Sequence, residues 1–185
     1  MNLTIREATK KDADLIAHVV AMAMGYDLAA DYAGDEDVIK VIGEVALCDD
    51  TQYSYQNALI AEIEGNPAGA IVGYDGGQLG RLREGSLSVI RRYHPDINIT
   101  EDETEPGEFY LDSIGVLPEF RGQGIASRLI ASMADKARMA GHARCGLLVD
   151  FGNGNAERLY SSLGFRYVGE RPFFGHMMKH LQKEI

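Results

Sequence analysis

The alternation of hydrophobic and polar residues predicts a strand and then two helices at the start of the chain. Residues 3–7 alternate with the period of a strand. Helices are expected from about residue 9 to 24 and from about Asp35 to Leu47, because apolar side chains recur there at helical spacing. The positions predicted to face inward are Ala13, Ile16, Ala17, Val20 and Met24 in the first helix, and Val38, Ile39, Ile42 and Val45 or Ala46 in the second.

A β-hairpin is expected after these helices. Ala58 to Glu64 and Ala68 to Tyr74 are apolar runs of strand length. The residues between them, Gly65, Asn66 and Pro67, are typical of a turn. The sequence therefore predicts two antiparallel strands that are neighbours in the sheet.

The stretch from 76 to 107 is less regular than the rest of the chain. We interpret it as an insertion or long loop within one domain of residues 1–185. Residues 79–93 could form a helix, whereas 95–107 contain two prolines and the acidic run 101–105. An acidic run of this kind is usually a solvated loop.

Regular alternation returns at Phe109 and continues to the end of the chain. The helix from Gly124 to Ala140 should end at Gly141, which stands where a helix C-cap is expected. Its inward positions are Ile125, Leu129, Ile130, Met133 and Ala137. Strands are expected at 109–116, 145–151, 165–170 and 177–181, with a helix at 153–163. The order is β-α-α-β-β, an insertion, then β-α-β-α-β-β, which predicts an α/β fold with a mixed sheet of six to seven strands flanked by about four helices.

The loop between the strand 109–116 and the following helix has the features of an anion site. Amide groups in the first turn of a helix lack intrahelical partners, and the helix dipole places partial positive charge there. Gly122 and Gly124 let an anion approach the backbone, and Arg121 can add a formal charge. The loop is therefore predicted to bind a diphosphate.

A dinucleotide-binding turn is the competing interpretation. Ser127 stands where the third small residue of G-x-G-x-x-G would lie, and Asp150 closes the next strand, where an acid could bind a ribose. That fold places its glycine turn after the first strand, whereas about a hundred residues precede Gly122 here. A glycine turn without a ligand is the third interpretation.

Two linked motifs make the chain resemble the GNAT superfamily of acyl-CoA-dependent N-acyltransferases. The first motif, [Q/R]-x-x-G-x-[G/A], is matched by Arg121, Gly124 and Ala126. The second runs from Asn153 through Tyr160 to Phe165. The resemblance covers about residues 109–168 and implies a splayed central sheet, acetyl-CoA as cosubstrate, and direct attack of an amine on the thioester.

The resemblance also implies roles for particular residues. Backbone groups of Ile114, Gly115 and Val116 would contact the pantetheine arm, and Asn153 would contact the same arm from the next helix. Tyr160 would lie near the thioester sulfur and protonate the leaving thiolate. The pyrophosphate would lie on Arg121, Gly122, Gln123, Gly124, Ile125, Ala126 and Ser127. From the residues alone, Tyr160 could equally be a packed core tyrosine, and Asn153 a helix N-cap.

The general base is left open by the sequence. The amine must lose a proton before it can attack, and a backbone N–H near Val116 could bind the oxyanion. Some family members carry an acidic, histidine or tyrosine side chain where this chain has Tyr110 or Leu148, and Leu148 cannot accept a proton. Asp112 has the same strand parity as Tyr110, so both are expected to face one side of the sheet. Glu108 is the third candidate.

Charge points to a cationic acceptor. The net charge is −10, which leaves no basic footprint for nucleic acid. Acidic residues crowd the region that borders the acceptor site in this family, and the acidic run 101–105 could approach the same site. They are Asp27, Asp31, Asp35, Glu36, Asp37, Glu44, Asp49 and Asp50, against a single Lys40. We expect a primary amine on a polyamine, an aminoglycoside-like molecule or a basic peptide N-terminus, although surface acids also serve solubility.

The remaining features concern the location of the protein, metal binding, oligomeric state and the alternative to an enzyme. No apolar run is long enough to span a membrane, and the first residues lack an apolar signal core, so we expect a cytoplasmic protein. Cys48 and Cys145 are far apart without metal-ligand spacing, which predicts two buried thiols and no metal. The sequence is compatible with a homodimer. A catalytically silent sensor of acyl-CoA with the same fold is the alternative to an enzyme.

Overall fold

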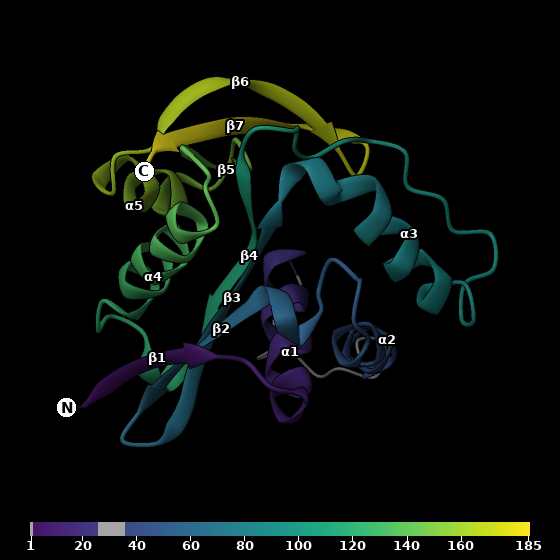
Figure 1. The fold of residues 1–185 in the computed structure, drawn as a ribbon, viewed down its shortest axis with the longest axis horizontal. Coiled ribbons are helices and arrows are strands. Elements are labelled where there is room, and N and C mark those ends of the chain that lie inside the picture. The colour runs from purple at the N-terminus through teal and green to yellow at the C-terminus, as the bar shows by residue number, and fades with distance from the viewer. Residues whose placement is uncertain (1, 26–35) are drawn as a thin grey trace.

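A seven-stranded sheet flanked by five α-helices accounts for most of residues 2–25 and 36–185, which the computed structural model describes (Figure 1). The strands lie in the order β1-β2-β3-β4-β5-β7-β6, and only the β4–β5 pair is parallel. The strands are β1 (Leu3–Glu7), β2 (Ala58–Ile63), β3 (Asn66–Asp75), β4 (Phe109–Val116), β5 (Arg144–Val149), β6 (Arg166–Phe173) and β7 (His176–Glu184). The helices are α1 (Ala13–Ala23), α2 (Glu36–Leu47), α3 (Leu79–Ile90), α4 (Ile125–Met139) and α5 (Gly154–Ser162). The predicted mixed α/β fold and its element order are confirmed.

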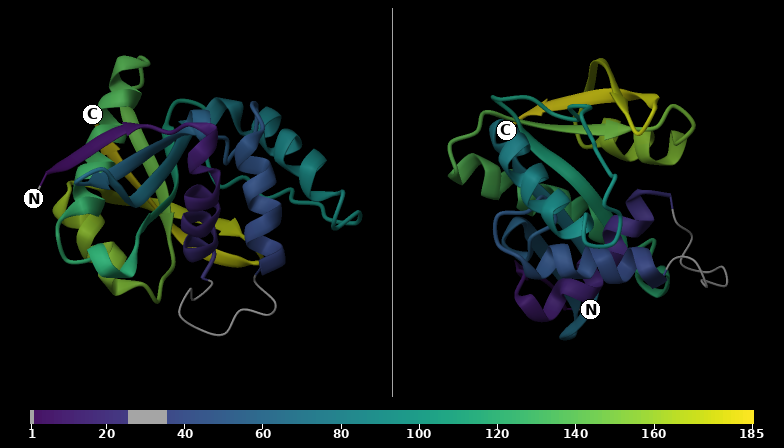
Figure 2. Two further views of the ribbon diagram at one scale, coloured as in Figure 1. Left: turned by 90° about the horizontal axis from the view of Figure 1, so that it is seen from below. Right: turned by 90° about the vertical axis from the view of Figure 1, so that its right-hand side faces the viewer.

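The helices cover both faces of the sheet, as Figures 1 and 2 show. The alternation within β2 explains this arrangement. Leu59 and Ala61 pack in the cluster that contains α4, whereas Ala58 and Ile60 pack in the cluster formed with α1 and α2. Because neighbouring side chains of a strand point to opposite faces, an unbroken apolar run is buried on both sides.

β4 and β5 separate from each other after a short parallel contact. They pair only at Phe109 with Cys145 and at Tyr110 with Gly146, as far as their residues are described. On its other edge β4 stays paired with β3 as far as Val116, and β5 is paired along its length with β7. The sheet is therefore splayed between its two halves, and the end of β4 presents an unpaired edge to the gap.

Most inward positions predicted for the helices are buried. All five predicted for α4 are 2% exposed or less, and Gly141 follows that helix with φ +91°. The prediction that Met24 faces inward was wrong, because α1 ends at Ala23 and the Met24 side chain is 41% exposed. In α2 the fully buried face includes Val41, whereas Val38 and Ile39 are only half-buried.

The stretch 76–107 contains α3 and then a strap, residues 91–107, that crosses back to β4. The expectation of a solvated acidic run was wrong for its centre, because Glu103 is 2% exposed and Thr104 is 3% exposed. Thr104 Oγ1 donates to Glu108 Oε1 at 2.6 Å. Gly76 packs so closely under the strap that a Cβ there would overlap the Glu105 carbonyl. Tertiary contacts with α3 and β4 therefore override the local preference for solvent.

The other structural expectations concern thiols, metals and membranes. Both cysteines are free, and Cys145 is buried whereas Cys48 is half-buried. Among residues 2–25 and 36–185, no group of three or more His, Cys, Asp or Glu side chains is arranged to hold a metal ion. None of the described helices is long and apolar enough to cross a membrane.

Candidate active site

A cavity of about 450 Å³ lies where β4 and β5 separate. Its walls come from β4 and β5, from α4 and α5, from the end of α1, and from single residues of β3, β6 and β7. Nine of the predicted site residues line it: Tyr110, Asp112, Ile114, Gly115, Val116, Arg121, Ala126, Asn153 and Tyr160. The fold thus brings the two sequence motifs to one site, although about thirty residues separate them.

The glycine loop forms the entrance to α4. Gly122 and Gly124 adopt φ values of +74° and +75°, a region that other residues rarely occupy. A Cβ at either position would meet nothing within 4 Å, so the backbone faces open space. Gly124 is the N-cap, and the first intrahelical bond runs from Arg128 N to Gly124 O at 3.2 Å. The amides that precede Arg128 are therefore available to an anion.

Other members of this loop differ in what they expose. The Ile125 side chain is 1% exposed and packs in the core, so only its backbone can meet a ligand. Gln123 is exposed and Ser127 is half-exposed. Arg121 is exposed, and its Nε donates to Val116 O at 3.1 Å, which holds the guanidinium beside the end of β4. A cation therefore lies close to the glycine loop and to the cavity.

Asn153 and Tyr160 come from α5. The Asn153 side chain accepts a hydrogen bond from Ala156 N at 3.1 Å, so it is the N-cap of the helix while it also lines the cavity. The Tyr160 ring packs edge-on against Phe165, with 5.9 Å between ring centroids. Burial raises the pKa of Tyr160 to about 12, so its hydroxyl carries a proton at neutral pH.

Asp112 lines the cavity from β4. Ser113 Oγ donates to its Oδ1 at 2.7 Å, and Tyr74 Oη donates to its Oδ2 at 2.9 Å. Burial raises the pKa of Asp112 to about 6, although both hydrogen bonds favour the ionised form. At neutral pH the side chain is a carboxylate whose proton affinity is unusually high for an aspartate.

Tyr110 and Glu108 are less suited to accept a proton. Tyr110 is buried and packs edge-on against Tyr74, and burial together with Asp112 raises its pKa well above the ordinary value. Glu108 is absent from the cavity wall and accepts from Thr104, His180 and Gln182. Burial acts against its charge, yet these hydrogen bonds keep its pKa below the ordinary value. Glu108 is a structural anchor between β4, β7 and the strap.

Several cavity residues were not predicted from the sequence. Met22 and Ala23 line the cavity from the end of α1, and Phe173 and Met178 line it from β6 and β7. The family resemblance pointed to the first two helices as a border of the site, but not to these side chains. Phe173 and Met178 carry no local signal, because only the pairing of β5 with β7 brings the last two strands to the cavity.

The acidic residues expected near the acceptor are placed differently. Asp27, Asp31 and Asp35 lie outside the described residues, as does the side chain of Glu36. Glu44 accepts from Tyr93, Asp49 accepts from Tyr55, and Asp50 pairs with Arg81. Apart from Asp112, the acid that lines the cavity in the described part of the chain is Asp150, which lies 3.5 Å from His176 Nε2.

Comparison with known proteins agrees with this geometry. Residues 26–165 match the acetyltransferase (GNAT) family. The thialysine N-epsilon-acetyltransferase of Sus scrofa is 30% identical over 174 residues, which span 91% of this chain and 87% of that protein. An uncharacterized protein of Mycobacterium leprae (strain TN) is 38% identical over 69 residues, but this match spans 37% of the present chain and only 18% of that protein.

Solved structures share the whole fold. A crystal structure of an acetyltransferase is 34% identical, with a TM-score of 0.80 and 98% of both chains covered. The PaiA N-acetyltransferase of Thermoplasma acidophilum, solved in complex with coenzyme A, is 15% identical, with a TM-score of 0.60 over the full length of both chains. The second likeness concerns the fold alone.

Proposed function

Because this chain belongs to the acetyltransferase (GNAT) family and is an N-acetyltransferase, we propose that it moves the acetyl group of acetyl-CoA to a primary amine on a cationic small molecule or peptide. The observation that carries the proposal is the placement of Asp112 and Tyr160 on two walls of one cavity, between strands that have separated. One wall supplies a proton acceptor and the other a proton donor.

The cofactor is proposed to enter along the splayed edge of β4. Its pyrophosphate lies on the amides from Gly122 to Ser127, with Arg121 adjacent, because these donors face open space at a helix N-terminus. The pantetheine arm follows the unpaired edge of β4 from Val116 toward Ile114 and passes Asn153. The fold relative solved in complex with coenzyme A supports the choice of cosubstrate.

The chemical step needs three groups. Asp112 accepts a proton from the ammonium form of the acceptor, directly or through a water, and the free amine attacks the thioester carbonyl. The amide of Val116 is proposed to bind the oxyanion. When the tetrahedral intermediate collapses, the carbon–sulfur bond breaks and the Tyr160 hydroxyl gives its proton to the thiolate. The attacking nitrogen, which is positively charged in the intermediate, releases its second proton to solvent during the collapse, and the tyrosine regains a proton from solvent. The products are an N-acetyl amide and coenzyme A.

The acceptor is proposed to be cationic because the cavity carries Asp112 and Asp150. A primary aliphatic amine, with an ordinary pKa of about 10, is protonated at neutral pH and is attracted to such a site. The name of the Sus scrofa relative specifies the N-epsilon group of thialysine, an amine of this class. Phe173 and Met178 offer apolar surface for the rest of the acceptor.

A coupled assay of thiol release tests the proposal. Acetyl-CoA is combined with a panel of cationic, neutral and acidic amines, thialysine among them, and products are identified by mass spectrometry. We expect turnover on cationic primary amines, with kcat reduced about 100-fold or more by Asp112→Asn and about tenfold or more by Tyr160→Phe. Matched controls are Asp96→Asn and Tyr167→Phe, both at exposed positions outside the cavity. Turnover confined to neutral or acidic amines would contradict the acceptor class, and full activity of Asp112→Asn would contradict the assigned base.

A further inference from the structure

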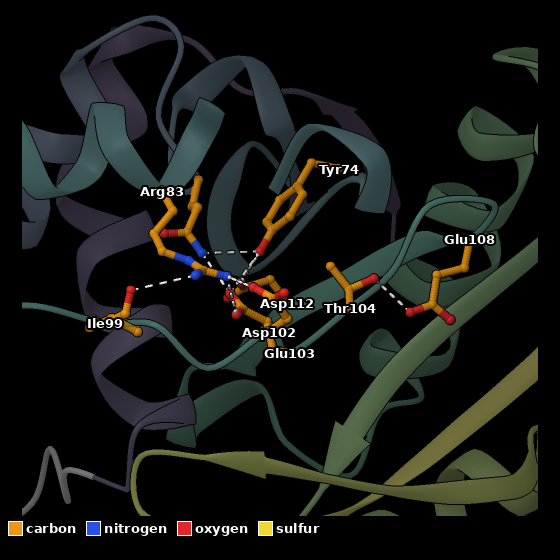
Figure 3. A network of polar contacts seen from close by, with 9 residues as sticks. Tyr74, Arg83, Ile99, Asp102, Glu103, Thr104, Glu108 and Asp112 are labelled. Carbon is orange, nitrogen blue, oxygen red and sulfur yellow. Dashed lines mark hydrogen bonds and ion pairs between the residues drawn. The ribbon is translucent and has the colours of Figure 1, made fainter. Parts of the chain in front are cut away.

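A second carboxyl group, more deeply buried than the half-buried Asp112, lies behind it. Glu103 comes from the strap and is 2% exposed, although the residue before it, Asp102, is exposed. The Tyr74 hydroxyl stands between the two acids, 2.9 Å from Asp112 Oδ2 and 3.3 Å from Glu103 Oε1 (Figure 3). A hydroxyl carries one proton and accepts others, so Tyr74 can connect the two carboxyl groups in either direction.

The surroundings hold this arrangement in place. Gln52 Nε2 donates to Glu103 Oε1 at 2.7 Å and to Tyr74 Oη at 3.1 Å, and Gln52 is itself buried. These contacts use both hydrogens of the Gln52 amide. The single hydroxyl proton of Tyr74 can then be donated either to Glu103 or to Asp112. Arg83 is the cation that faces the pair, with Nη2 3.5 Å from Glu103 Oε2.

The charges around the pair are unevenly distributed. Arg83 also forms a shorter ion pair with Asp102, at 2.6 Å, so its charge is shared with an exposed acid (Figure 3). Among the residues that the structure describes, the other titratable groups that face the pair are tyrosines from β3, β4 and the segment before β2: Tyr74, Tyr110 and Tyr53. Asp112 and Glu103 lie close together, and the nearby cation is shared with Asp102. Ionisation of both carboxyl groups at once is therefore unfavourable.

We propose that Glu103 is a positioning residue that takes over, through the Tyr74 hydroxyl, the proton that Asp112 removes from the acceptor amine. This inference rests on the proposed role of Asp112. In the step, Asp112 gives its new proton to Tyr74 Oη while Tyr74 gives its own proton to Glu103 Oε1. Asp112 is again a carboxylate, Tyr74 is again a neutral phenol, and Glu103 is a carboxylic acid. No oxidant or further reactant is required.

The consequence is a base stronger than an isolated aspartate. Burial raises the pKa of Glu103 to about 7, and the charge of Asp112 contributes to the increase. Burial raises the pKa of Asp112 to about 6. The amine proton therefore ends on Glu103, the group with the higher pKa. Both pKa values lie close to neutral pH, where a general base is most effective. The two carboxyl groups titrate as one coupled system.

Carboxyl carbon NMR on protein labelled at Asp and Glu tests the coupling without an acceptor. We expect the half-buried Asp112 and the buried Glu103 to titrate near pH 6 and pH 7 in the wild type. Glu103→Gln should remove the higher step, and Asp112→Asn should lower the pKa of Glu103 by about one unit because a neighbouring negative charge is lost. A Glu103 signal that is unaffected by Asp112→Asn would overturn the proposal. Glu84→Gln, on the exposed side of α3, is the control.

The pH dependence of kcat/KM, with acetyl-CoA and thialysine, tests the proton transfer. In Glu103→Gln the acidic limb should move about one unit lower, because only Asp112 must then ionise, and the plateau should fall about threefold or more because the base is weaker. Tyr74→Phe should lower the plateau of kcat/KM to a similar extent. The variant that combines Tyr74→Phe with Glu103→Gln should have a plateau no lower than that of either single variant. If the acidic limb and the plateau of Glu103→Gln equal those of the control variant Glu84→Gln, the proposal is overturned.

Two further outcomes separate this inference from simpler explanations. A Glu103→Gln variant with a lower unfolding midpoint and an unmoved limb would assign Glu103 a purely structural role, which contradicts the proposal. Full activity of Asp112→Asn would remove the proposed base itself, whereas loss of activity in Asp112→Asn with no effect of Glu103→Gln would reject only the transfer to Glu103. If thialysine is not an acceptor, the NMR titration decides.

Discussion

Replacing Asp112 by asparagine should make the protein more stable at alkaline pH while it removes activity. The folded structure disfavours the charge of this side chain, because burial raises its pKa from 3.8 to about 6. At a pH above both values, the ionised side chain costs the folded state about 3 kcal/mol, since each unit of pKa shift corresponds to about 1.4 kcal/mol. Asparagine is uncharged and avoids that cost.

The sign of the pH dependence follows from the raised pKa. Below about pH 4 the carboxyl group is protonated in both the folded and the unfolded chain, and its contribution to stability is complete. Between about pH 4 and 6 the unfolded chain ionises while the folded chain does not, so stability falls as pH rises. Above pH 6 both forms are ionised and the loss is complete. Asparagine has no such loss.

Urea unfolding at pH 5 and pH 8 measures the free energy of unfolding of Asp112→Asn relative to the wild type. Comparing the two pH values removes any effect of the substitution that does not depend on pH. Asparagine can accept from Ser113 but offers an N–H toward Tyr74, and the cost of that mismatch is nearly the same at both pH values. The free energy of unfolding of Asp112→Asn, relative to the wild type, should increase from pH 5 to pH 8 by about 1.5 kcal/mol through the lost Asp112 charge, and by about 1 kcal/mol more because the pKa of Glu103 falls by about one unit. Asp96→Asn should show no such change. A difference that stays flat, or that decreases with pH, would refute the assignment of Asp112 as a base whose pKa is raised in the folded protein.

Three further substitutions test other parts of the site. Tyr160→Phe should reduce kcat about tenfold or more and leave the KM for acetyl-CoA within about twofold, because the lost group acts on the leaving thiolate; a rise in KM at constant kcat in steady-state assays would argue for a binding role. Gly124→Ala should raise the KM for acetyl-CoA and cost about 1 kcal/mol in urea unfolding, because alanine is strained at φ +75°; an unchanged KM would exclude this loop as the phosphate site. Gly146→Ala should lower the free energy of unfolding by about 2 kcal/mol or more, because its Cβ would overlap the Glu108 carboxylate; thermal unfolding equal to that of the wild type would contradict the close packing there.

The sequence predicted the elements because their periods are local properties. The run in β2 and the helical spacing in α4 follow from which side chains face the core, and both were identified within one or two residues of their ends. The backbone of the glycine loop was also anticipated, because Gly122 and Gly124 and the start of a helix are adjacent in the sequence, whereas phosphate binding there stays a prediction. Asn153 was correctly expected at an N-cap, and its place at the cavity agrees with the family resemblance.

The environment of Asp112 could not be predicted in the same way. Glu103 lies in an acidic run whose local pattern indicates solvent, and it is buried only because α3 brings Arg83 and the segment before β2 brings Gln52 to the same point. These contacts join residues 20 and 51 positions apart. A tyrosine in β3 gives no sign, from its own neighbours, that its hydroxyl will stand between two acids.

The strap explains why such a site can be stable. It has no regular secondary structure between α3 and β4, so polar contacts must hold it. Arg83 holds one part through Ile99 O and Asp102, and at the other end Glu105 pairs with Arg171 of β6. Arg171 also donates to His180 Nδ1, whose Nε2 lies 2.9 Å from Glu108 Oε2. The strap that buries Glu103 is therefore tied to the same two strands that supply Phe173 and Met178 to the cavity. The group proposed to store the acceptor's proton and the apolar wall proposed to receive the acceptor are parts of one connected structure, so changes at Arg171 should affect both.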